Sequence, residues 1–202
     1  GTVKVEVWLT ESENQAWERF QLLLQAGWFR EAQAELDLLP TPQSPEEKVV
    51  WARIHGLAGD HSNAITLMAS AWDEDRRLIR PVLYGLSFPD EYNSMIQKNA
   101  EKQNISAALI AGLIKQESLF QVDAVSPAHA AGLMQLMSVT AQDSAQFLNY
   151  KKKLNFPNDL FDPEVNLLFG TSYLKRMVRA FNGYLPLALG SYNLGIGRLK
   201  KW

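Results

Sequence analysis

The chain has 202 residues, of which 47% are hydrophobic and 21% are charged, and its formal net charge is -2. This balance is typical of a globular protein with one large or two small domains, and it argues against a nucleic-acid-binding surface. The chain has no cysteine, which excludes disulfide frameworks and thiolate metal sites.

The remaining composition gives no sign of a metal, a cofactor or a membrane span. The histidines His55, His61 and His129 are scattered and have no clustered carboxylates beside them, so we expect no metal site, and nothing else in the sequence implies a cofactor. No apolar run approaches the ~20 residues of a membrane-spanning helix. The basic run at residues 151–153 is typical of a solvated loop or helix end. The opening GTVKVEVW has no initiator methionine or signal peptide, so we expect a mature or trimmed product.

The first part of the chain predicts helical hairpins. After an alternating stretch, VKVEVW, that could be a strand or an ordered lead-in, LLLQAGWFREAQAEL and IHGLAGDHSNAITLM align at an offset of 32 residues. The alignment places Gly27 over Gly59 and Ala32 over Ala64. Each copy predicts a helix, a glycine turn and a second helix, and the period is close to the ~34 residues of tetratricopeptide-type repeats. We expect residues 1–87 to form a superhelix of helical hairpins. The family to which these repeats belong stays open.

A domain boundary follows. Residues 72–80 (WDEDRRLIR) predict a charged helix that Pro81 ends or kinks. The glycine, serine and proline of LYGLSFPDEY then mark the boundary. From about Tyr92 the pattern is helical again with almost no strand signal, so we expect residues 88–202 to form a mostly α-helical second domain.

One helix of the second domain carries a glutamate on its apolar face. The segment NISAALIAGLIKQES predicts this helix, with Asn104 as its N-cap, and Glu117 lies over Leu113 and Ile114 one turn back. In one reading Glu117 lies past the buried part of the helix and points into water. In the other it is half-buried at the edge of a cleft, where desolvation raises its pKa and keeps it protonated, as a general acid requires.

Three motifs follow one another along the second domain: QES at 116–118, AVSPAHAAGLMQLM at 124–137, and the final LALGSYNLGIGRLKKW, with LFDPEVNLLFGTSYL between the last two. In this order they resemble the catalytic domain of the soluble lytic transglycosylases. The resemblance implies an all-α fold, in which a TPR-like superhelix (1–87) precedes a goose-type lysozyme-like catalytic domain (88–202).

The resemblance also implies an activity, namely cleavage of the β-1,4 bond between N-acetylmuramic acid and N-acetylglucosamine in peptidoglycan. In that family one glutamate, here Glu117, protonates the glycosidic oxygen and then acts as base on the muramoyl C6 hydroxyl, which closes a 1,6-anhydro ring without water. The implied partners are peptidoglycan glycan strands, and the implied location is the bacterial periplasm or cell envelope. The helical first half could also recruit protein partners.

The sequence offers no convincing second catalytic acid. Asp123 reads as a turn or cap residue, and Asp143 as a solvated helix position. Most glycosidases use two carboxylates. A lone acid fits intramolecular attack, where the substrate supplies its own nucleophile.

Further positions carry over from the family one by one. Ser126 matches a serine that helps to position the acid or the sugar, although a turn hydroxyl is the alternative. Met134 and Gln135 match a pair that lines the cleft, with Gln135 placed to bond an acetamido or hydroxyl group; core packing is the alternative for Met134. Gly132 is expected to allow close backbone approach at a helix start.

The last motif supplies two more substrate-binding positions. Tyr192 and Asn193 match the family's AYNxG motif, in which the phenol would contact Glu117 or the sugar and the asparagine would hold the loop or helix end. A buried tyrosine with a satisfied hydroxyl is the alternative for Tyr192. Tyr173 and Glu164 lie in family-like surroundings, and we expect structural roles for them.

Three positions depart from the family pattern. His129 stands where glycine is common, and Ser191 and Leu194 stand where alanine is common. If the glycine has a positive φ, His129 strains its loop. Leu194 could narrow the cleft. The family usually continues with more helix after the third motif, so part of the cleft floor is expected to be missing here.

Two alternative functions stay open. A goose-type lysozyme-like hydrolase would use the same cleft and admit water. A catalytically weak scaffold or peptidoglycan-binding protein would keep the fold without turnover. The joint presence of Glu117, Ser126, Gln135 and Tyr192 argues against the scaffold, because a binding module has no need for the acid.

Overall fold

The computed structural model describes residues 9–195, without the side chains of residues 81 and 82. It divides into two compact units, unit 1 (Gly1–Asp90) and unit 2 (Glu91–Trp202). The boundary expected from the sequence lay a few residues earlier, between 87 and 88. The stretch VKVEVW falls outside the described residues.

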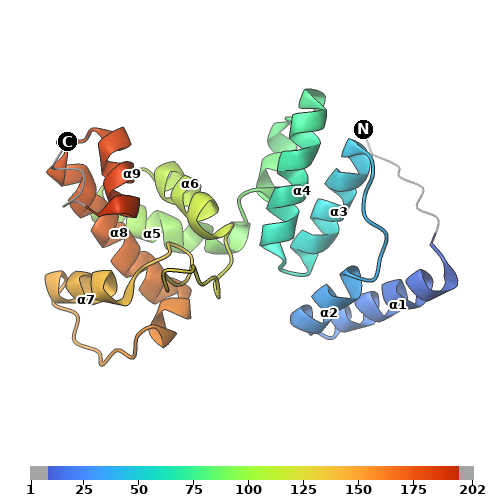
Figure 1. Cartoon of the computed structure of the whole chain (residues 1–202), viewed down its shortest axis with the longest axis horizontal. Coiled ribbons are helices and arrows are strands. Elements are labelled where there is room, and N and C mark those ends of the chain that lie inside the picture. The colour runs from blue at the N-terminus through green and yellow to red at the C-terminus, as the bar shows by residue number, and fades with distance from the viewer. Residues whose placement is uncertain (1–8, 196–202) are drawn as a thin grey trace. The chain divides into compact units, whose positions relative to one another are not determined.

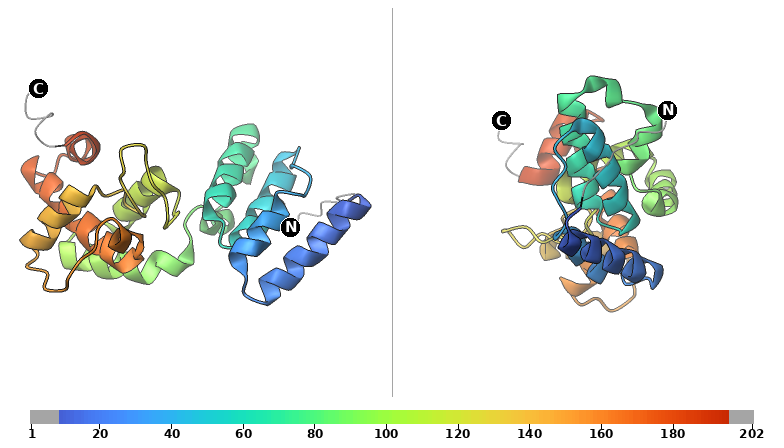
Figure 2. Two further views of the ribbon diagram at one scale, coloured as in Figure 1. Left: turned by 60° about the horizontal axis from the view of Figure 1, so that its bottom comes forward. Right: turned by 90° about the vertical axis from the view of Figure 1, so that its right-hand side faces the viewer.

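Unit 1 contains two helical hairpins, as the sequence pattern predicted (Figures 1 and 2). Its helices are α1 (Glu11–Gln25), α2 (Phe29–Leu36), α3 (Pro45–Leu57) and α4 (His61–Glu74). Helix α1 packs against α2 and α3 against α4. The two hairpins share a hydrophobic core, in which Phe20 of α1 and Leu36 of α2 lie with Trp51 of α3.

Side chains at the helix starts explain where these helices begin. Thr10 and Glu13 form a capping box at α1, and Ser44 and Glu47 form another at α3. Each box satisfies backbone N–H groups that the first turn leaves without partners.

The matched positions of the repeat play matched roles. Gly27 and Gly59 have φ of 77° and 71° and form the two hairpin turns, a backbone conformation that glycine adopts without steric cost. Ala32 and Ala64 are buried, and their small side chains let the paired helices pack closely.

The charged stretch after Trp72 is not one helix, contrary to the expectation. Helix α4 ends at Glu74, because Asp75 has an extended backbone. The Asp75 side chain accepts a hydrogen bond from the backbone N–H of Arg77 at the start of a short 3-10 helix, η1 (Arg76–Leu78). A second 3-10 helix, η2 (Pro81–Leu86), follows.

Unit 2 is also helical, so the predicted all-α class is confirmed for the described chain. Its α-helices are α5 (Asn93–Gln103), α6 (Ala107–Ser118), α7 (Ser138–Phe147), α8 (Pro163–Ala180) and α9 (Leu185–Leu194). Helix α8 packs against α5, α7 and α9 (Figure 1). Within residues 9–195 the only extended pairing is two isolated bridges, Val125 with Ala131 and Ala131 with Leu136.

The start of α6 differs from the prediction. Helix α6 begins at Ala107 with Ser106 as its N-cap, whereas Asn104 is the left-handed C-cap of α5, with φ of 50°. Asparagine is favoured at N-caps and also tolerates left-handed backbone, so the residue type alone could not separate the two positions.

One buried side chain fixes the irregular segment between α6 and α7. Asn166 of α8 is fully buried. Its Oδ1 accepts a hydrogen bond from the Met134 N–H at 2.8 Å, and its Nδ2 donates to the carbonyls of Ala131 at 2.9 Å and Leu160 at 2.8 Å. The segment is therefore tied to α8 by an amide whose donor and acceptor are both used.

Gly132 permits this close approach. Its φ is 75°, and a Cβ placed there would lie 2.1 Å from the Leu160 carbonyl oxygen and 2.3 Å from Asn166 Nδ2. The expected close backbone approach is confirmed, but Gly132 lies in the turn between the bridging residues Ala131 and Leu136 rather than at a helix start.

Candidate active site

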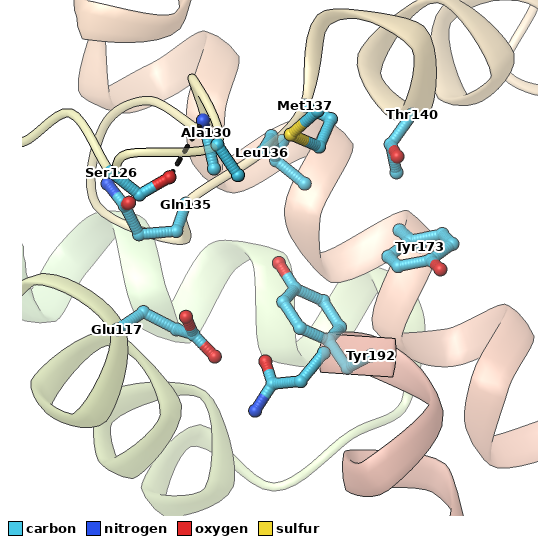
Figure 3. Close-up of a pocket in the computed structure, with 11 residues that line it drawn as sticks. Glu117, Ser126, Ala130, Gln135, Leu136, Met137, Thr140, Tyr173 and Tyr192 are labelled. Carbon is cyan, nitrogen blue, oxygen red and sulfur yellow. Dashed lines mark hydrogen bonds between the residues drawn. The ribbon is translucent and has the colours of Figure 1, made fainter. Parts of the chain in front are cut away.

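Unit 2 contains a pocket of about 230 Å³ at the C-terminal end of α6 (Figure 3). Its walls come from α6, the segment before α7, and helices α7, α8 and α9. The lining residues are Glu117, Ser126, Ala128, Ala130, Gln135, Leu136, Met137, Thr140, Tyr173, Tyr192 and Asn193. Residues from 117 to 193 thus meet around one cavity.

Glu117 is the only carboxylate among these lining residues. Its side chain is half-buried over the buried Leu113 and Ile114. Its Oε1 is buried and has no hydrogen-bond partner among the described residues. Because desolvation penalises the charged form, burial raises the pKa of Glu117 above its ordinary value of 4.5. The geometry agrees with the reading of a half-buried acid at the edge of a cleft.

The loop opposite Glu117 is closed by Ser126. Its Oγ accepts a hydrogen bond from the Ala130 N–H at 3.0 Å (Figure 3), and its own N–H donates to the Ala130 carbonyl at 2.9 Å. His129, at the tip of this loop, is exposed and has φ of 61°. Because φ is positive at this position, the histidine that stands in place of the common glycine strains the loop. The Ser126 hydroxyl proton has no acceptor among the described residues and can be donated to a ligand.

Gln135 lines the pocket and also holds its wall. Its Nε2 donates to the carbonyls of Ala124 and Gly132, both at 3.0 Å. Both amide hydrogens are therefore engaged with the backbone. The amide oxygen, which has no partner in the described part of the chain, is the group that Gln135 can offer to a ligand.

Met134 does not line the pocket, contrary to the expectation. It is fully buried, and its side chain packs so closely on Gly170 of α8 that a Cβ on that glycine would lie 2.4 Å from the Met134 sulfur. The residue that reaches the pocket from this stretch is Met137. Met134 acts through its backbone, whose carbonyl accepts a hydrogen bond from Tyr192 Oη at 2.8 Å.

Two tyrosines form the wall that faces Glu117 (Figure 3). The rings of Tyr192 and Tyr173 lie 5.2 Å apart, centroid to centroid, at an interplanar angle of 53°. Tyr192 is buried, and desolvation, followed by the negative charges of Glu117 and Tyr173, raises its pKa well above 10. Its hydroxyl therefore stays protonated as a donor, although the donor is already used by Met134.

Tyr173 was expected to be structural, and the structure places it in the pocket wall. Its hydroxyl has no partner among the described residues. Burial raises its pKa, with Arg176 opposing the shift. The Arg176 guanidinium lies 5.4 Å from the centre of the Tyr173 ring and 5.3 Å from that of Phe147, and it donates to Ser144 Oγ at 3.0 Å. Arg176 thereby joins α8 to α7 behind the pocket wall.

The other predicted positions divide into those inside and those outside the pocket. Asn193 lines it from the end of α9. Leu194 is 54% exposed and does not line it, so it does not narrow the cleft in this structure. Ser191 is fully buried outside the pocket lining, and its Oγ has no hydrogen-bond partner among the described residues. Neither Asp123 nor Asp143 lines the pocket.

Sequence reasoning missed Met137 and Thr140, and it placed Tyr173 in a structural role. The signal for Met137 was present, since LMQLM offers two methionines three residues apart, but only the fold decides which one turns inward. Thr140 carries no signal of its own, because a threonine in the first turn of a helix is ordinary.

Residues 9–195 contain neither a candidate metal-binding cluster nor a candidate membrane-spanning helix. No group of three or more histidine or acidic side chains there could hold a metal ion. None of the helices in that range has the length and apolar character needed to cross a bilayer.

Fold and site together define a lysozyme-like, α-helical domain with one acid in a cleft. Residues 94–202 match the transglycosylase SLT domain family. A soluble lytic murein transglycosylase from Salmonella typhimurium is 30% identical over 145 residues, which cover 71% of this chain and 21% of that protein.

Solved structures show the same fold. The 70-kDa soluble lytic transglycosylase of Escherichia coli superimposes with a TM-score of 0.75 over 98% of this chain and 31% of that one, at 24% identity. Lytic transglycosylase Slt from Pseudomonas aeruginosa, solved as an inactive glutamate-to-glutamine mutant, gives 0.74 over 97% and 31%, also at 24% identity.

The chain belongs to the transglycosylase SLT domain family. It spans less than a third of the length of the relatives it matches.

Proposed function

We propose that this chain is a lytic transglycosylase, which cleaves the β-1,4 bond between N-acetylmuramic acid and N-acetylglucosamine in peptidoglycan. The observation that carries the proposal is the pocket in which Glu117, half-buried and with a raised pKa, is the only lining carboxylate. Family membership supports the same reaction.

Glu117 acts twice in the proposed mechanism. In its protonated form it donates its proton to the glycosidic oxygen as the bond from that oxygen to the muramoyl C1 breaks. The carboxylate then takes the proton of the muramoyl C6 hydroxyl, whose oxygen forms a new bond to C1. The product is a 1,6-anhydro ring, and Glu117 regains its proton. Because the nucleophile is part of the substrate, no water is consumed.

The lone acid favours this reaction over hydrolysis. An inverting hydrolase needs a second carboxylate to activate water, and a retaining one needs a second carboxylate as nucleophile. Asp123 and Asp143 both lie outside the pocket lining. Among the described residues, the pocket supplies the acid for transglycosylation but no second acid for either hydrolytic route.

The other lining groups are proposed to hold the sugars. The Ser126 hydroxyl and the Gln135 amide oxygen are the free polar groups on the loop side, and they match acetamido and hydroxyl partners. Asn193 adds an amide from α9. Tyr192, whose hydroxyl is bound to Met134, is proposed to offer its ring rather than its hydroxyl.

Digestion of purified peptidoglycan, with products weighed by mass spectrometry, tests the proposal. We expect disaccharide peptides that end in 1,6-anhydromuramic acid, one water lighter than hydrolysis products. Replacing the acid (Glu117→Gln) should lower their release by about 10²–10⁴-fold, the usual contribution of a general acid or base. Asp123→Asn, which removes an acid outside the pocket, is the matched control and should retain activity.

The alternatives predict other results. Reducing-end products would identify a lysozyme-type hydrolase. Binding of peptidoglycan without turnover by the parent chain would identify a scaffold or binding protein. Both outcomes would overturn the proposal.

We further propose that the chain acts in the bacterial periplasm or cell envelope, where its substrate lies. Protein partners of the helical unit 1 remain a prediction from the superhelical pattern. Capture of partners by unit 1 from an envelope extract, compared with capture by unit 2, would test that prediction.

A further inference from the structure

Unit 2 contains a second pocket, of about 280 Å³, that shares no lining residue with the first. Its residues come from α5, the segment before α8, and the first turns of α8. They are Met95, Lys98, Asn99, Lys102, Tyr150, Lys152, Asp162, Glu164, Val165 and Leu168. Along α8 the nearest lining residues of the two pockets, Leu168 and Tyr173, stand five positions apart, which corresponds to roughly 7.5 Å of helix.

One face of α5 forms a wall of this pocket. Met95, Lys98, Asn99 and Lys102 follow the helical spacing that places side chains on one face. Like charges four residues apart, such as Lys98 and Lys102, disfavour a helix slightly. No described residue forms an ion pair or hydrogen bond with either of these ammonium groups or with that of Lys152.

A buried amide adds a second, independent feature. Asn99 is only 8% exposed, yet it lines the pocket. Its Nδ2 donates to the Met95 carbonyl at 2.9 Å. Its Oδ1 has no partner among the described residues. The oxygen itself is not buried, so it opens onto the pocket, where solvent or a ligand can supply a donor.

The acidic side of the pocket is smaller than the basic side. Asp162 is the N-cap of α8, and its Oδ1 accepts from the N–H groups of Glu164 and Val165. The helix terminus partly compensates its charge. Glu164 remains as the free carboxylate of a lining that also contains three free lysines. The pocket thus offers several cationic donors, one anionic acceptor and an apolar floor of Val165 and Leu168.

We propose that this lysine-rimmed pocket binds the peptide part of peptidoglycan, a short peptide with several free carboxylates and a free amino group. The lysines bind the carboxylates, and Glu164 and the Asn99 oxygen accept from the amino group and peptide N–H groups. This inference rests on the proposed function, because it takes its ligand from the same substrate. It assigns the peptide to a site apart from the sugar pocket.

Calorimetric titration of the whole chain with a synthetic peptidoglycan tetrapeptide, free of sugar, tests the assignment. We expect binding that Lys98→Gln with Lys152→Gln weakens about tenfold, since two partly exposed charge pairs are lost. The matched control is Lys151→Gln with Lys153→Gln, which removes the same amount of charge from the two lysines that flank Lys152 and lie outside the pocket lining. The control should bind within about twofold of the parent chain.

Two further titrations separate the pockets. Glu117→Gln should bind the tetrapeptide like the parent chain, and a neutral N-acetylglucosamine oligosaccharide should not displace it. Absent tetrapeptide binding, displacement by the oligosaccharide, or equal loss in both lysine pairs would overturn the inference. Loss of glycan cleavage with lysine-dependent tetrapeptide binding intact would refute the proposed function alone.

Discussion

In unit 1 the described residues with a left-handed backbone are two glycines, Gly27 and Gly59, each in the turn of a hairpin. In unit 2 the segment 119–135 holds four left-handed residues that are not glycine. These are Leu119, Phe120, His129 and Gln135. The remaining non-glycine examples in residues 9–195 are all asparagines, the residue type that tolerates this backbone best.

The difference shows where unfavourable backbone is retained. A left-handed non-glycine residue costs about 1–2 kcal/mol, and such cost persists where the surrounding structure over-determines the conformation. The strained segment begins two residues after Glu117 and ends in the pocket wall. The hairpins, by contrast, use glycine wherever the chain must turn. Strain in this chain is concentrated around the pocket, and the following variants test that contrast.

The largest effect on stability is expected when a left-handed glycine of the pocket segment is replaced by alanine. The comparison is the same replacement at a left-handed glycine of a hairpin turn. Gly132→Ala would place Cβ within 2.3 Å of two neighbouring atoms, and we expect it to destabilise unit 2 by about 3 kcal/mol or more. Gly59→Ala has a similar φ but nothing within 4 Å, so it should cost about 1 kcal/mol. Hydrogen-exchange mass spectrometry resolves the two units. Equal losses of stability in the two variants would show that the backbone angle alone determines the cost. That result would contradict the proposed difference between the pocket segment and the hairpins.

The next effect concerns the hydrogen bond that crosses the pocket wall. Tyr192→Phe removes the donor to the Met134 carbonyl and should destabilise unit 2 by about 1–2 kcal/mol, because a buried acceptor is left unmatched. Tyr184→Phe is the control, since that ring is 60% exposed. Urea unfolding followed by circular dichroism measures both. Equal effects would mean that the wall bond contributes nothing.

A smaller, opposite effect is expected at the loop tip. His129→Gly should stabilise unit 2 by about 1 kcal/mol, because the strain at φ of 61° is relieved. Asn182→Gly, at φ of 50°, should change stability by only a few tenths of a kcal/mol or destabilise. A destabilising His129→Gly would show that the imidazole makes a contact that outweighs its strain.

The smallest effect is a pH dependence. Burial raises the pKa of Glu117 in the folded chain, so the folded state holds the proton to higher pH than the unfolded state. Well below pH 4.5, Glu117 is protonated in both states and its ionisation does not affect the free energy of unfolding. As the pH rises, its ionisation increasingly lowers the free energy of unfolding, until this effect levels off above the pKa of the folded state. Glu117→Gln lacks this titration. Its melting temperature should exceed that of the parent chain at pH 7, and the difference should vanish in acid. A difference independent of pH would contradict the raised pKa.

The helical architecture was readable because its signals are local. The spacing of apolar residues, the capping residues and the glycine turns predict helices within a few residues of where they lie. The end of α4 was missed because Asp75, acceptable within a helix, instead caps the next turn with its side chain.

The site was readable only in part, because neighbours in the sequence do not tell which side chain faces a cavity. Glu117, Ser126, Gln135, Tyr192 and Asn193 lie around one pocket. Met134 was misplaced because the turn at Gly132 directs it toward Gly170. That turn depends on Asn166, more than thirty residues later, and no local pattern shows such a partner.

The bond between Tyr192 and Met134 joins segments 58 residues apart, and this separation has a consequence for biosynthesis. A ribosome delivers Glu117, the strained segment and α8 before α9 exists. Until α9 docks, the acid stands beside an open surface, because Tyr192 has not yet joined Tyr173 in the pocket wall. Contacts between such distant segments form late in folding. A nascent chain therefore acquires its acid early and its complete pocket last.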